Sequence, residues 1–248
     1  MTARPVRQAL VAVLLLSVWE SVVRIGAISP LVLPRPSAIA VTARANAEIL
    51  VQGLASTVAT ALAGLALGFA FGLALVILLA KYQRLAEPLS ALFSAYESLP
   101  KIALAPIFVL WFGVGPLFRV LLAASMTLYV FAVFAARIAS LKSVPAVDMF
   151  RTMGGESWRI GIYVVSNLAR PELGAAIRLA APAALLGALI AEFVVASDGI
   201  GQLLNTALGG LQSDLAFACL FAIAGAGALL QLLGALVGGT AMSISDGR

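Results

Sequence analysis

The sequence predicts an all-α, polytopic membrane protein: one domain over residues 1–248, built as a bundle of about six transmembrane helices. Composition is the first reason, because 62% of the residues are hydrophobic and 11% are charged, whereas a soluble domain is about half apolar and a quarter charged. The second reason is a set of six apolar stretches, each close to the roughly 20 residues that cross a hydrocarbon layer. The third is a single long polar interruption, residues 144–170, before the last two stretches.

The first expected span, residues 8–28, follows Arg4 and Arg7 and lacks the small-residue cleavage site of a signal peptide. We therefore expect a retained anchor. A Pro-rich connector and a short amphipathic piece follow it. The other spans are expected at residues 54–80, 88–112, 117–136, 172–195 and 215–237.

Two of these spans carry distinctive residues. Gly64, Gly68 and Gly72 recur every four residues in the second span, so they share one helical face where another backbone can approach closely. Pro100 and Pro106 punctuate the third span. The glycine face predicts helix packing rather than a direct role in transport.

The distribution of Lys and Arg predicts the orientation. With the N-terminus in the cytoplasm, the outside segments hold four basic residues: Arg24, Arg35, Arg44 and Arg119. The cytoplasmic side then holds eleven: Arg4, Arg7, Lys81, Arg84, Arg137, Lys142, Arg151, Arg159, Arg170, Arg178 and Arg248. Positive loops stay inside, so we expect both termini and residues 144–170 in the cytoplasm. The same bias explains the net charge of +5 without a nucleic-acid partner.

Three ionisable residues fall inside the expected spans: Glu97, Lys101 and Glu192. A charge at bilayer depth is costly and normally faces protein or a water-filled cavity. Glu97 and Lys101 are four residues apart, the spacing of a helical ion pair. Two readings stay open for all three: they line or gate a translocation pathway, or they form interhelical hydrogen bonds that hold the bundle.

The polar interruption has a pattern of its own. Pro145 suits a first helical turn, Gly154-Gly155 ends that helix, and a second can start at Glu156. A short helix–Gly–helix element would be a rigid projection to which a soluble partner can bind. The plainer alternative is an interfacial helix that joins two spans.

These residues resemble the coupling-helix motif of permease subunits of ATP-binding-cassette (ABC) importers, the binding-protein-dependent inner-membrane components. That motif runs Glu-Ala-Ala, three residues, Gly, nine residues, then Ile-x-Leu-Pro. Here Asp148-Met149-Phe150 stands at the first three positions, Gly154 at the glycine and Val164 at the isoleucine, while Ser166-Asn167 replaces Leu-Pro.

Further segments resemble the sulfonate/nitrate/taurine-type subfamily of these permeases, in the same order along the chain. They are Trp19-Glu20, residues 33–37 (LPRPS), 100–106 (PKIALAP), 110–115 (LWFGVG), Ala191-Glu192 and residues 199–201 (GIG).

The resemblance implies the type I importer fold and a homodimer with the pathway between its subunits, in the bacterial inner membrane. It also implies two separate ATPase subunits that carry ATP and Mg²⁺, and an external solute-binding protein. The cargo would be a sulfonate, a nitrate-like anion or a vitamin precursor. The residues it implies for ATPase coupling are Asp148, Phe150, Arg151, Thr152, Gly154 and Glu156.

Two other classes remain to be compared. A self-sufficient secondary transporter or channel would favour inverted repeats, and the sequence shows no clear repeat. A membrane enzyme would need a catalytic constellation, yet the chain has no histidine, one cysteine (Cys219) and no G-x-x-x-x-G-K-[ST] phosphate loop. We therefore expect no catalytic residue, metal or cofactor in this chain.

Overall fold

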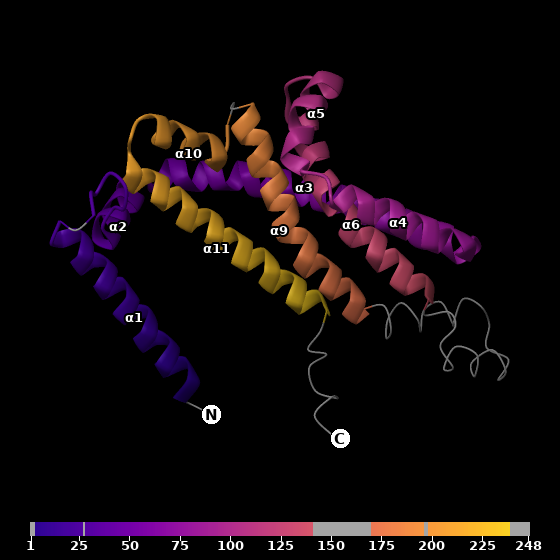
Figure 1. The fold of residues 1–248 in the computed structure, drawn as a ribbon, viewed down its shortest axis with the longest axis horizontal. Helices are drawn as coiled ribbons and strands as arrows, with labels where there is room; N and C mark the ends of the chain where they lie inside the picture. Colours follow the sequence, from indigo (N-terminus) through magenta and orange to yellow (C-terminus); the bar gives the residue numbers. More distant parts are fainter. Residues whose placement is uncertain (1–2, 27, 141–169, 196–197, 239–248) are drawn as a thin grey trace. The chain divides into compact units, whose positions relative to one another are not determined.

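The computed structural model describes residues 3–26, 28–140, 170–195 and 198–238, and every regular element in those ranges is helical. Figure 1 follows these helices along the chain. Their bounds are α1 Ala3–Arg24, α2 Pro36–Ala45, α3 Ala47–Lys81, α4 Ala86–Glu97, α5 Ala105–Phe112, α6 Pro116–Ser140, α9 Arg170–Val194, α10 Ile200–Gly209 and α11 Ser213–Gly238. Short 3-10 turns at Gln83–Leu85 and Lys101–Leu104 flank α4.

Four of these helices are long and apolar enough to cross a membrane: α3, α6, α9 and α11. The pair α4 and α5 passes the same test together, but it is bent by 88°. The span expected at residues 88–112, with Pro100 and Pro106 inside it, is thus two helices joined by a bend, because Pro100 cannot donate the backbone hydrogen bond that would continue α4. That the pair forms one span stays a prediction. Helix α1 is outside this set and carries Arg7, Glu20 and Arg24, so its role as the first span stays a prediction.

The chain divides into two compact units. Unit 1 comprises Met1–Ser56 with Ala196–Gly225, and unit 2 comprises Thr57–Val195 with Ala226–Arg248. Because α3 and α11 each cross a boundary in sequence, both helices contribute residues to both units.

In unit 1, two side-chain clusters join segments that are distant in sequence. The Glu20 carboxylate accepts hydrogen bonds from the Ser37 N–H (3.1 Å) and the Ser37 hydroxyl (2.8 Å). This satisfies a first-turn donor of α2 that has no partner within the helix. The indole of Trp19 lies 6.1 Å from the Phe217 ring and 6.3 Å from the Phe221 ring, which joins α1 to α11.

Unit 2 is organised around α6. Helix α9 packs along α6 (Figure 1), and α4 and α5 also contact it. On the α3 side, a Cβ added at Gly64 would lie 2.5 Å from the Cβ of Ala123, and one added at Gly72 would lie 2.9 Å from the Cβ of Phe131. These contacts confirm that the glycine face of the second span packs against another helix.

Apolar side chains fill the spaces around this contact. Phe131, Phe134 and Ile138 of α6 pack with Ala176 and Ala180 of α9. Phe118, Leu122 and Met126 form a second cluster with Ala105 of α5 and with α9. The buried core of unit 2 therefore surrounds α6 and holds α5 and α9 against it.

Candidate functional site: the charged break between α4 and α5

The break between α4 and α5 brings charge into the middle of an apolar segment. Helix α4 ends at Glu97, Pro100 follows three residues later, and a 3-10 turn begins at Lys101. The backbone closes the end of α4 with short-range bonds, from Ser98 N–H to the Ala95 carbonyl (3.2 Å) and from Leu99 N–H to the Tyr96 carbonyl (3.1 Å). The break is thus a hydrogen-bonded corner.

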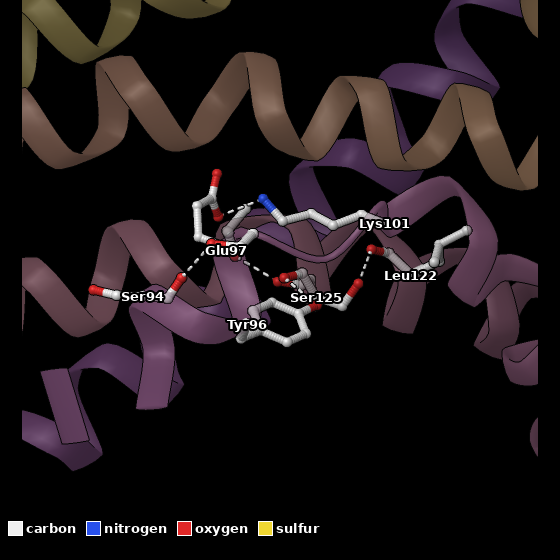
Figure 2. Close-up of polar contacts among 9 residues, drawn as sticks. Ser94, Tyr96, Glu97, Lys101, Leu122 and Ser125 are labelled. Atoms are coloured by element: carbon white, nitrogen blue, oxygen red, sulfur yellow. Dashed lines mark hydrogen bonds and ion pairs between the residues drawn. The ribbon is translucent and has the colours of Figure 1, made fainter. Parts of the chain in front are cut away.

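An ion pair spans this corner. The Lys101 ammonium donates to the Glu97 carboxylate, as Figure 2 shows. The two partners are unequally covered, since the Lys101 side chain is 16% exposed and the Glu97 side chain 44%. Hydrocarbon cannot solvate a carboxylate, so the open side of Glu97 must face water or another protein subunit.

The corner is also fixed to α6. The Tyr96 hydroxyl donates to the Ser125 carbonyl at 3.0 Å, and the Ser125 hydroxyl turns back to the Leu122 carbonyl at 2.7 Å (Figure 2). Ser125 is buried. One residue before the charged pair, the chain is therefore anchored to the central helix of unit 2, and this limits how far the Glu97 carboxylate can move.

Glu192 lies elsewhere in unit 2, on α9, and it is fully buried. The Thr57 hydroxyl, also fully buried, lies 2.7 Å and 2.9 Å from the two carboxylate oxygens of Glu192. The structure therefore does not place Glu192 in one cluster with the Glu97–Lys101 pair. In this structure it makes the interhelical contact of the second reading, and its role in the pathway stays a prediction.

A second exposed ion pair was not foreseen from the sequence. The Arg137 guanidinium, in the last turn of α6, donates to both carboxylate oxygens of Glu172 at 3.1 Å and 2.9 Å. Glu172 is in the first turn of α9. The pair joins the two helix ends that flank residues 141–169. The sequence shows a basic residue in the last turn of one helix and an acidic residue in the first turn of the other. That the two form a pair is known only from the structure.

The six residues predicted for ATPase coupling, together with most of the 144–170 segment, lie outside the described residues. They are Asp148, Phe150, Arg151, Thr152, Gly154 and Glu156. Their assignment continues to rest on the sequence.

A comparison with family models decides the class of the protein. The model for the binding-protein-dependent transport system inner membrane component matches residues 64–241. The chain belongs to this family. It is therefore a permease subunit of an ABC importer and a multi-pass membrane protein, which confirms the predicted helical bundle and sets aside a self-sufficient secondary transporter or channel.

Individual relatives of the permease agree with this assignment. A probable ABC transporter permease protein of Haemophilus influenzae is 31% identical, over 89% of this chain and 90% of its own length. The formylaminopyrimidine transport permease protein of Halalkalibacterium halodurans is 31% identical, over 90% and 86%. The taurine transport system permease protein of Escherichia coli is 27% identical, over 88% and 82%. These relatives span nearly the same length as this permease, and their names cover two cargo classes.

Family membership gives the charged break a context. Permeases of ABC importers work with ATPase subunits and with a solute-binding protein, so the charged corner belongs to a subunit that passes a solute across the membrane. The matched residues 64–241 include α4, the corner and α5.

Proposed function

We propose that this permease forms the translocation pathway as a symmetric homodimer, and that the corner at Glu97 and Lys101 lines that pathway. The observation that carries the proposal is the 44% exposed Glu97 carboxylate in a broken apolar segment. In a lone subunit this carboxylate would face lipid. In a dimer, the same face lies at the subunit interface, where water and solute pass.

The cytoplasmic side couples the pathway to ATP. We assign ATPase docking to residues 144–158 and contacts in the ATPase groove to Asp148, Phe150, Arg151, Thr152 and Glu156, with Gly154 permitting the chain reversal. The Arg137–Glu172 ion pair supports this assignment. It joins the helix ends on both sides of the segment, so a push from the ATPase reaches α6 and α9 together. ATP and Mg²⁺ bind the partner subunit, and this chain is not itself the enzyme.

We place both termini in the cytoplasm of a bacterial cell, in its inner membrane, because eleven basic residues fall on that side and four on the other. On this arrangement the solute-binding protein meets the permease at the opposite face, where α2 and α10 lie in sequence between spans.

Among the cargo classes, a vitamin precursor fits better than a sulfonate or a nitrate-like anion. At the corner the carboxylate is the more exposed partner and the ammonium the more covered one, so an anionic cargo would meet the repelling charge first. The relative named for formylaminopyrimidine transport is also slightly more similar to this chain than the one named for taurine.

The test is uptake by the reconstituted transporter: this chain, its ATPase and its solute-binding protein in proteoliposomes. ATP-driven accumulation of a formylaminopyrimidine-type solute, and not of taurine, is the expected result. Uptake that needs no ATPase would contradict the proposal, and taurine uptake would contradict the cargo class alone.

Variants of the coupling segment test its role within the same assay. Gly154→Val should insert normally but lose uptake and ATPase binding, because a β-branched residue is poorly tolerated where the chain reverses. Arg151→Glu should weaken docking less. The matched control is Gly115→Val, since a Cβ at Gly115 meets nothing within 4 Å. Full uptake by both coupling variants would leave this segment a mere connector.

A further inference from the structure

Unit 1 contains a preformed cavity of about 340 Å³. The turn before α2, one face of α2 and the turn before α11 line it, with Leu31, Thr42, Asn46, Leu211, Gln212 and Asp214 among the lining residues. The Ser213 hydroxyl donates to the Leu31 carbonyl, which fixes one wall against another. The cavity is thus a feature of the folded unit, and its lining combines polar groups, one acid and three leucines.

Leu211 has an unusual backbone conformation at the rim of this cavity. Helix α10 ends in a Schellman motif, with bonds from Leu211 N–H to the Leu208 carbonyl (3.2 Å) and from Gln212 N–H to the Ala207 carbonyl (2.8 Å). The residue after the cap in this motif is usually glycine because its φ is positive. Here it is Leu211, with φ of 54°, although Gly209 and Gly210 directly precede it.

The Leu211 side chain makes little stabilising contact with the rest of the chain. It is 73% exposed, and Leu31 on the other wall is 64% exposed. A leucine in the left-handed region carries a steric cost that glycine avoids, and strained, exposed residues concentrate at binding sites. The position is best explained by a contact that Leu211 makes with another molecule.

Asp214 defines the charge of that molecule. It is half-buried in the cavity wall, and within the part of the chain that the structure describes it makes no side-chain hydrogen bond or ion pair. Among the described residues that line the cavity there is no Lys or Arg. A carboxylate in a partly desolvated site without a counter-ion favours a cationic group.

We propose that this cavity receives a Lys or Arg side chain of the external solute-binding protein. Asp214 is the counter-ion, and Leu31 and Leu211 pack against the methylene stem of the long basic side chain. The proposal rests on the proposed function, because the topology given there places α2 and the α10–α11 turn on the external face. Anionic lipid headgroups do not fit, since they would meet Asp214 and no cation.

Two variants separate docking from folding. Asp214→Asn keeps the size of the side chain and removes its charge. Leu211→Gly relieves the backbone and removes the apolar contact, so it should fold at least as well as the wild type. The matched control is Glu48→Gln, because Glu48 is an exposed carboxylate of the same unit that accepts from Gln52 and does not line the cavity.

The measurement is ATPase activity of the reconstituted transporter, titrated with the purified solute-binding protein of the same transporter. We expect Asp214→Asn and Leu211→Gly each to raise the half-stimulating concentration about 5–10-fold, with basal ATPase activity unchanged and the Asp214 effect shrinking at high salt. Glu48→Gln should match the wild type. Reversing one Lys or Arg of the binding protein to Glu should be rescued by Asp214→Lys.

Other outcomes overturn the inference. Wild-type titration curves for both cavity variants would mean that Asp214 only complements the α11 dipole and that Leu211 is a local feature of the turn. A change in the permease oligomer with Leu211→Gly would assign the surface to a second copy of this chain. An effect that depends on vesicle lipid and not on the binding protein would assign it to lipid. Absence of stimulation in the wild type would instead count against the proposed function.

Discussion

Helices α3 and α4 both pack on α6, but α3 does so through glycines, whereas the end of α4 does so through a tyrosine hydroxyl. The α3–α6 contact consists of glycines facing Ala123, Thr127 and Phe131, with no room for an added methyl group. At the end of α4, the Tyr96–Ser125 hydrogen bond makes the contact with α6. The Glu97–Lys101 ion pair lies directly after it, and the Glu97 carboxylate stays open on one side. The α3–α6 contact depends on close packing for its stability. The end of α4 keeps a charge that packing does not require, which is the pattern expected of a functional site.

The largest effect on stability should come from filling the α3–α6 contact. Gly64→Val places a side chain where a Cβ already lies 2.5 Å from the Ala123 Cβ and 2.9 Å from the Ala124 backbone nitrogen. We expect a loss of about 2–3 kcal/mol, read as a lower midpoint of thermal unfolding in detergent. Gly225→Val, where a Cβ meets nothing within 4 Å, is the control. Equal midpoints for the two variants would show that the contact is loose.

A smaller loss should follow when the buried Glu192 carboxylate loses a donor. Thr57→Val keeps the side-chain shape and removes the hydroxyl that lies 2.7 Å from Glu192. Leaving a buried acceptor without this partner costs about 1–3 kcal/mol. The neighbouring Ser56→Ala removes an exposed hydroxyl that donates to Asp198 at 2.8 Å, and it should change the unfolding midpoint much less. If Ser56→Ala lowers the unfolding midpoint more than Thr57→Val does, burial of the hydroxyl does not determine the loss of stability.

The charged corner should affect transport more than stability. Glu97→Gln removes an exposed charge, so unfolding should change little, whereas uptake should fall about tenfold if the charge serves transport. Exchanging the pair, with Glu97→Lys and Lys101→Glu together, restores the attraction with reversed polarity. Recovery of full uptake in the exchanged variant would make the corner a structural ion pair only.

The smallest effect on stability is expected at Arg137. The Arg137–Glu172 pair is solvent-exposed, and exposed pairs contribute little. Arg137→Gln should leave the unfolding midpoint unchanged and reduce solute transported per ATP hydrolysed, because the two helix ends are no longer joined by charge. The ratio of uptake to ATPase activity measures this, and a lower unfolding midpoint with an unchanged ratio would give the pair a purely structural role.

The two regions also differ in how far the sequence could predict them. The spacing of Gly64, Gly68 and Gly72 defines a helical face within one segment, so the close contact was predictable without its partner. The Glu97–Lys101 pair was likewise visible as a local spacing. Pro100 indicated a break, but the 88° bend depends on how α4 and α5 pack against α6.

Contacts between residues that are distant in the sequence could not be predicted from it. Thr57 and Glu192 are 135 residues apart, and nothing near Thr57 marks it as the donor to a buried acid. Leu211 was equally hidden, because a leucine after two glycines does not show which of the three adopts a positive φ. The coupling segment was predicted by resemblance to the family, and its residues lie outside the described ranges.

Thiol labelling at position 97 tests the pathway assignment most directly. In the Cys219→Ser background, which removes the only native cysteine, Glu97→Cys places a thiol beside the Lys101 ammonium, which favours the reactive thiolate. Leu110→Cys is the control, because Leu110 is 82% exposed on the apolar helix α5 and is expected to face lipid. We predict that a charged, water-soluble methanethiosulfonate labels position 97 at least about tenfold faster than position 110, and that trapping the ATPase with vanadate changes the rate at 97 alone. Equal labelling at the two positions, or a rate at 97 that ignores the state of the ATPase, would contradict a pathway at this corner.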